Sequence, residues 1–280
     1  MLSLETEYDL TWRGAIGAHR RYSCKDDANV LDDAGRVVRR ERRTADVSTV
    51  VLGLASDAMP IVRWTFTGFT SEVERHRFDD LDPPLAASVL ESAFPQEALP
   101  PGPVVLEGAP EASDNYFIDL AAIGLAPKSL GAAGAGWLVA HTRVFWLIAT
   151  RKHGGIDRLR SLGDSTRMPW SGTVEYAQPG EYSGAAVHRA ENILCFDGLT
   201  IRQGREAALL TFRTPYDPSV PGWGPAHTEP SGQIWIDIAS GELLAAEVMS
   251  MSYASGIPQA NGGSVPLNLR FETSLDLISD

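Results

Sequence analysis

The sequence predicts an α+β protein: one long, curved antiparallel sheet (a half-barrel) with helices packed on its concave face. Alternating apolar and polar residues, the pattern of half-buried strands, fill the first and last thirds of the 280-residue chain. About residues 79–163 are instead proline-rich or helix-like. Alternating stretches far longer than an ordinary strand indicate strong curvature. We therefore expect one β-rich domain over residues 1–280 with a central helical insertion.

Strands are expected first, over Thr6–Cys24, Gly35–Leu54 and Met59–Phe78. In the third stretch, Val62, Trp64 and Phe66 alternate with polar residues. Aspartate and glycine between Asp32 and Gly35 mark the turn between the first two stretches.

Helices are expected in the middle, over Leu85–Ala93, Asp114–Gly124 and Ser129–Arg151. In the last of these, Trp137, His141, Phe145 and Ile148 fall on one helical face. The same segment is rich in β-branched and aromatic residues, so a buried strand is an alternative for it.

The chain is expected to return to strands after Asp164. The expected strands are Gly172–Ala177, Gly184–Cys195, Thr200–Arg213, Gln233–Ile238, Glu242–Tyr253 and Leu267–Ile278. The segment Tyr216–Glu229 is rich in proline and glycine and is predicted to be a mobile lid. Asp237 is expected to cap the turn before Gly241 rather than to act as a catalytic acid.

Composition excludes several classes of function. A net charge of −12 disfavours binding to nucleic acid or to anionic lipid. No secretory signal and no run of 18 apolar residues is visible, so a cytoplasmic protein without an integral membrane segment is expected; an exported form with its signal removed is the alternative. Cys24 and Cys195 are expected to be reduced thiols, and no cofactor or metal site is predicted. The sequence does not indicate an oligomeric state.

The segment from Leu162 to Tyr253 resembles the β half-barrel of lipoprotein carriers. The resemblance rests on a Gly-Asp entry, on successive strands, and on a final hairpin with Ile236, Asp237, Ser240, Gly241 and Leu243. It covers about a third of the chain. The resemblance implies a half-barrel with a helical plug around an apolar cavity that holds a lipid-like molecule, without catalysis.

The leading functional prediction is that the protein binds a hydrophobic small molecule in an apolar cavity between the sheet and the helices. Aromatic side chains suit the walls of such a cavity. The candidate ligand-binding residues are Trp137, Phe145, Trp146, Trp170, Trp223 and Trp235.

Two other functions compete with ligand carriage. A cofactor-independent cyclase, isomerase or hydrolase of a hydrophobic metabolite would use His141, or His153 with Asp157, as general acid and base. A structural or interaction module would use the long sheet itself. The run RVVRRERR (Arg36–Arg43) is interpreted as a solvated strand face or as a clamp for a carboxylate or phosphate of a ligand.

Overall fold

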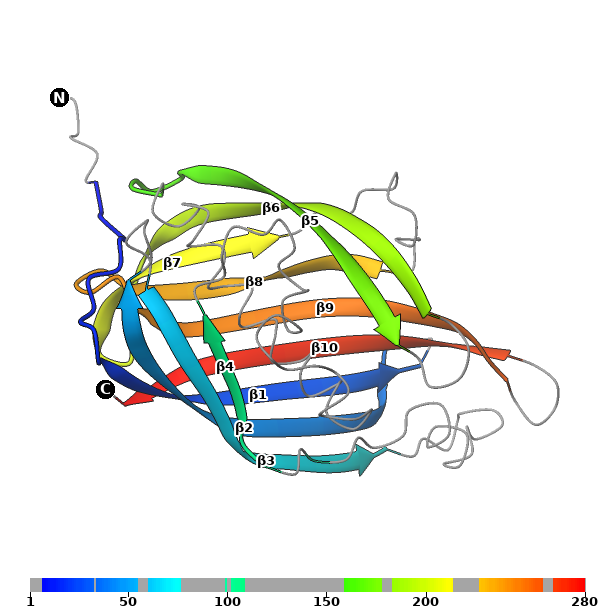
Figure 1. Ribbon diagram of the computed structural model, residues 1–280. Coiled ribbons are helices and arrows are strands. Elements are labelled where there is room, and N and C mark those ends of the chain that lie inside the picture. The colour runs from blue at the N-terminus through cyan, green and yellow to red at the C-terminus, as the bar shows by residue number, and fades with distance from the viewer. Residues whose placement is uncertain are drawn as a thin grey trace.

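The computed structural model describes residues 7–32, 34–54, 60–76, 99, 102–108, 159–177, 183–213, 227–258 and 264–279. These residues form one open, curved antiparallel sheet of ten strands (Figure 1). The strands lie in the order β4-β3-β2-β1-β10-β9-β8-β7-β6-β5. Their bounds are β1 His19–Leu31, β2 Val37–Leu54, β3 Pro60–Arg75, β4 Val104–Gly108, β5 Ser165–Ala177, β6 Ser183–Arg202, β7 Arg205–Arg213, β8 His227–Asp237, β9 Leu243–Pro258 and β10 Ser264–Ser279.

The sheet consists of two meanders that meet at the pairing of β1 with β10. Strands β1 to β4 follow one another on one side, and β5 to β10 follow one another on the other. Cys24 of β1 lies opposite Leu275 of β10, and this register runs from Arg21 to Leu31. The first and last strands therefore lie side by side in the middle of the sheet.

Long strands give the sheet its curvature, as their length in the sequence predicts. β2 has 18 residues and β6 has 20, several times the length of a common strand. Strands of this length accumulate twist. Both ends of the sheet curl toward the same side, so that β3 and β4 face β5 (Figure 1).

The predicted α+β class is wrong for the part of the chain that the structure describes. The described residues are all β and contain no helix, so no helix is seen against either face of the sheet. Inside the predicted helical insertion, Val104–Gly108 pairs with Val62–Phe66 as the edge strand β4. The predicted helices Leu85–Ala93, Asp114–Gly124 and Ser129–Arg151 lie outside the described residues. The prediction of one domain is not tested and stays a prediction.

Two strand predictions and the lid prediction need correction. The first strand begins at His19, because the preceding segment crosses the end of the sheet instead. Thr200–Arg213 is a hairpin, since Gln203 and Gly204 have φ values of 54° and 76° and form the tight turn between β6 and β7. Of the predicted lid, His227–Glu229 belongs to β8, and its remaining residues lie outside the described chain.

Candidate ligand-binding face

Alternation along the strands places a continuous apolar cluster on one face of the sheet. We call this the inner face; it bears Tyr22 and Cys24 of β1, and the opposite face is the outer face. The rings of Tyr22 and Trp64 stack with centroids 6.0 Å apart, although β2 lies between their strands. The cluster continues from β3 to β6 through Ala45, Val47, Phe66, Leu275, Leu277, Leu244, Ala246, Val248, Ile234, Ile236, Ala208, Leu210, Phe212, Leu194 and Phe196.

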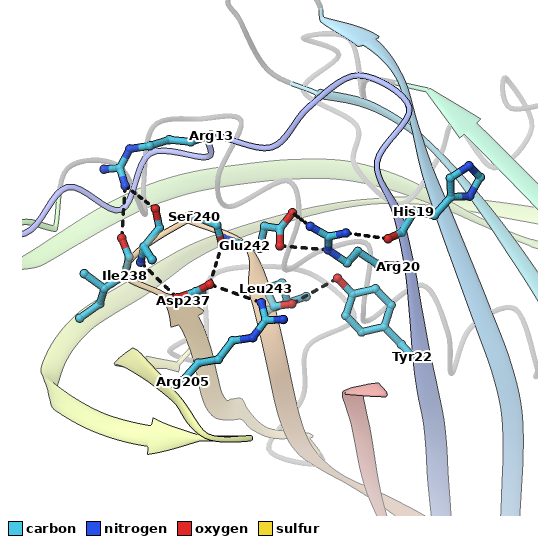
Figure 2. A network of polar contacts seen from close by, with 11 residues as sticks. Arg13, His19, Arg20, Tyr22, Arg205, Asp237, Ile238, Ser240, Glu242 and Leu243 are labelled. Atoms are coloured by element: carbon cyan, nitrogen blue, oxygen red, sulfur yellow. Dashed lines mark hydrogen bonds and ion pairs between the residues drawn. The ribbon is translucent and has the colours of Figure 1, made fainter. Parts of the chain in front are cut away.

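The segment before β1 covers one end of this cluster. Leu10 and Leu159 are buried in it, and the ring of Tyr8 meets the ring of Phe196 edge-on at 5.7 Å. The Arg13 guanidinium donates to the carbonyl oxygens of Ile238 and Ala239 at 3.2 and 3.0 Å (Figure 2). These bonds hold the segment against the hairpin that joins β8 to β9.

The same hairpin confirms the predicted role of Asp237 as a turn cap. Its carboxylate accepts the Ala239 N–H at 3.1 Å and the Ser240 hydroxyl at 2.8 Å. Beside it, Arg20 forms two bonds of 3.0 and 2.6 Å to Glu242 (Figure 2). Both carboxylates accept hydrogen bonds from neighbouring residues of the sheet and its turns. This network therefore has a structural role: it stabilises the end of the sheet.

A group of ionisable side chains occupies the inner face further along β1 and β2. We call Asp26, Arg39, Glu41 and Arg43 the inner charged cluster; their exposed fractions are 0, 2, 1 and 8%. Period-2 alternation explains the split within RVVRRERR, because Arg39, Glu41 and Arg43 point inward while Arg40 and Arg42 point outward. The interpretation of this run as a solvated strand face is therefore right for only one of its two faces.

One carboxylate in the inner charged cluster serves two guanidinium groups. Glu41 lies 3.3 Å from an Arg39 nitrogen and 3.3 Å from an Arg43 nitrogen, and it accepts the Ser71 hydroxyl at 3.0 Å. Asp26 accepts the hydroxyl of Thr273 at 2.7 Å and lies 3.8 Å from Arg43. Burying a charge costs free energy unless the charge is closely paired. Four ionisable side chains on one buried face therefore need an explanation.

The outer face carries a groove whose lining includes several charged side chains. A groove of about 820 Å³ lies over β1, β2, β8, β9 and β10 and includes Lys25, Glu247 and Glu272 in its walls. A smaller hollow of about 380 Å³ beside Cys195 shares Ser231, Gly232 and Gln233 with it.

Only one predicted site residue has a described side chain. Trp235 is a buried member of the hydrophobic core cluster, and the Arg202 guanidinium carbon lies 4.3 Å from its ring centroid; its role in ligand binding stays a prediction. Trp170 belongs to β5 opposite Ala190. The other predicted binding and catalytic residues are outside the described chain and stay predictions: Trp137, Phe145, Trp146, Trp223, His141, His153 and Asp157.

The sequence analysis missed Glu41 and Asp26 as members of a buried group. A signal for Glu41 was present, because it is the one acid in an arginine-rich run and shares its parity with Arg39 and Arg43. Asp26 gave no such signal, since its position opposite Arg43 and Thr273 depends on the register of three strands.

Neither cysteine forms a disulfide, in agreement with the prediction of two free thiols. Burial raises the pKa of the Cys24 thiol far above its usual value, and the nearby Asp26 raises it further. This thiol is therefore protonated and unreactive at neutral pH. Within the described ranges, no group of three histidine, cysteine, aspartate or glutamate residues could hold a metal ion.

No protein-family model matches the chain, and no curated protein matches it in sequence. Across the described residues, no helix is long and apolar enough to cross a membrane.

Proposed function

We propose that the protein binds a hydrophobic small molecule against the apolar part of the inner face. One observation carries this proposal: the apolar cluster extends from β3 to β6 across an open, curved sheet. The members of this cluster are buried, and apolar surface gains about 25 cal/mol for each Å² removed from water. A hydrophobic ligand gains from the same effect.

The polar content of the inner face is also compatible with a ligand site. Small-molecule sites are mostly apolar and contain a few polar groups that orient the ligand. Here the inner charged cluster borders the apolar cluster on the same strands, since Arg43 is followed inward by Ala45 and Asp26 is preceded by Cys24. The resemblance of Leu162–Tyr253 to lipoprotein carriers remains a prediction and supports the same class of ligand.

A photoreactive probe tests the proposal directly. Decan-1-ol carrying a diazirine is incubated with the full chain, and the labelled residues are identified by tandem mass spectrometry. We expect saturable labelling at inner-face positions such as Val47 and Leu210, which excess unmodified decan-1-ol suppresses. Their neighbours on the same strands, Ser48 and Thr211, serve as internal controls because their side chains point to the outer face. Labelling confined to the outer face, or labelling that never saturates, would contradict the proposal.

A further inference from the structure

A line of side chains crosses three neighbouring strands in the groove of the outer face. Lys25 of β1 lies opposite Ser274 of β10, and Ser274 lies opposite Glu247 of β9. All three residues line the groove, whose volume is about 820 Å³. A hollow of this size is ordinary for a small-molecule site. The groove therefore has room for a ligand where a cation and a carboxylate stand on either side of a hydroxyl group.

Lys25 is open to a ligand at one end of this line. Its side chain is exposed, and among the residues that the structure describes its ammonium group has no ion pair or hydrogen bond. Asp27, the next residue on the same face of β1, is held instead by Arg42, at 2.9 and 3.1 Å. Within the same described ranges, the Ser274 hydroxyl is also without a partner. An ammonium and a hydroxyl are both donors, so together they suit a carboxylate.

Glu247 is the negatively charged group at the other end of the line. Its side chain is 51% exposed, and its contact with Arg202 is long, at 3.5 Å. The same Arg202 nitrogen lies closer to Asp276, at 2.5 Å. Glu247 therefore shares a guanidinium whose main partner is another acid. It can accept an ammonium group from a ligand without losing a strong ion pair, because exposed pairs of this kind contribute little.

The separation of the two charges sets the length of the ligand. Adjacent strands lie about 4.8 Å apart, so Lys25 and Glu247, with one strand between them, lie about 9.6 Å apart along the backbone. An extended chain of three amino-acid residues spans about 10 Å. Met249, which follows Glu247 on the same face of β9, is 43% exposed and offers a flexible apolar contact to a ligand side chain.

We propose that the outer groove binds a short peptide with two free ends, of about the length of a tripeptide. Lys25 and Ser274 receive its carboxylate, and Glu247 receives its N-terminal ammonium group. A zwitterion meets both charges of the groove at once, whereas the net charge of −12 repels a simple anion. The groove lies on the face opposite to the apolar cluster, so this inference is independent of the proposed function.

Amide NMR titrations of the full chain with three peptides test the proposal. The peptides are trialanine, trialanine amide, which lacks the carboxylate, and N-acetyl-trialanine, which lacks the ammonium group. We expect trialanine to shift the amide signals of Lys25, Ser274 and Glu247 in a saturable manner. Blocking either end should weaken binding by about 3- to 10-fold, the effect of one charged hydrogen bond at a partly exposed site.

Two variants assign each end of the peptide to its residue. Lys25→Met should bind trialanine and trialanine amide equally and still discriminate against N-acetyl-trialanine. Glu247→Gln should show the reverse pattern. Both positions are exposed, so neither change should affect folding. Arg21→Met is the matched control: it removes a cation from the same face of β1 outside the groove, and it should leave all three affinities unchanged.

Four results would overturn the inference. The first is that trialanine does not bind. The second is that trialanine amide binds as tightly as trialanine or more tightly, because the groove would then not recognise the carboxylate. The third is equal binding of N-acetyl-trialanine, which would mean that the C-terminus of any chain suffices. The fourth is that both variants keep the discrimination of the wild-type protein, which would place the peptide elsewhere on the molecule.

Discussion

Arg39 and Arg42 lie three positions apart on β2 and have opposite environments. Arg39 is buried beside Glu41, whereas Arg42 is half-exposed and paired with Asp27. Alternation predicts that two residues of opposite parity lie on opposite faces. It does not predict which face is buried, because that depends on what packs against the sheet. This is why the arginine-rich run could be recognised in the sequence while its buried half could not.

Gly241 provides a prediction at the same scale. Its φ of +68° is unfavourable for any residue with a Cβ, and a Cβ there would collide with the carbonyl oxygen of Thr11 in the segment that crosses the hairpin. We expect Gly241→Ala to lower the free energy of unfolding by at least about 2 kcal/mol, measured by urea denaturation.

Gly35→Ala is the control for backbone strain alone. Gly35 has a φ of +77° and no atom within 4 Å of the position that a Cβ would occupy, so its substitution should cost about 1 kcal/mol. Equal losses in the two variants would show that the close approach of Thr11 contributes nothing to stability.

At the scale of elements, local patterns predicted strands well and their ends poorly. The hairpin from Gln233 to Val248 is confirmed because alternation, the Asp237 cap and Gly241 all favour the same turn. Tyr8, Leu10 and Trp12 also alternate, yet their segment is no strand and packs across the end of the sheet. An alternating sequence indicates only that every second side chain is buried. A segment that crosses the end of a sheet can have the same alternation without forming strand hydrogen bonds.

The turn that leads into β5 has a pH-dependent contribution to stability. The Asp164 carboxylate accepts the backbone N–H groups of Ser161 and Arg160 at 2.7 and 2.8 Å, and these bonds hold its pKa below the usual value. A lowered folded-state pKa contributes stability that is fully present above the unfolded pKa of about 4 and is lost as the pH falls through the folded-state pKa. Asp164→Asn should therefore lower the urea midpoint at neutral pH, and the difference from wild type should shrink in acid.

Asp197→Asn is the control, because Asp197 is an exposed acid nearby on β6. Its substitution removes one exposed carboxylate and should change the urea midpoint at neutral pH by less than Asp164→Asn does. A constant difference between Asp164→Asn and wild type at every pH would mean that the negative charge of Asp164 has no role in the turn.

The order of strands in the whole molecule was beyond sequence analysis. Neighbouring strands of each meander follow one another in the chain, which is the common arrangement and could be expected. The pairing of β1 with β10 joins residues about 250 positions apart, as Asp26 and Thr273 show with a separation of 247. No local sequence pattern predicts such a pairing. The inner charged cluster depends on it, because the Asp26 carboxylate accepts a hydrogen bond from the Thr273 hydroxyl of β10.

This pairing leads to a prediction about cooperativity. If the chain is one domain, the two meanders should unfold together, because β1 and β10 couple them through a shared core. Leu275 lies fully buried at this junction, opposite Cys24 on β1 and Ala246 on β9. Leu275→Ala should lower the free energy of unfolding by about 2–5 kcal/mol through the cavity it leaves. In Leu275→Ala, hydrogen exchange measured at increasing urea should show a loss of protection relative to wild type. This loss should be the same for amides of β2 and β3 as for those of β7 and β8. Ile278→Ala, an exposed position on the same strand, should change both by less than about 0.5 kcal/mol. Protection that falls in one meander while the other keeps its wild-type value would show that β1 and β10 join two units that fold independently.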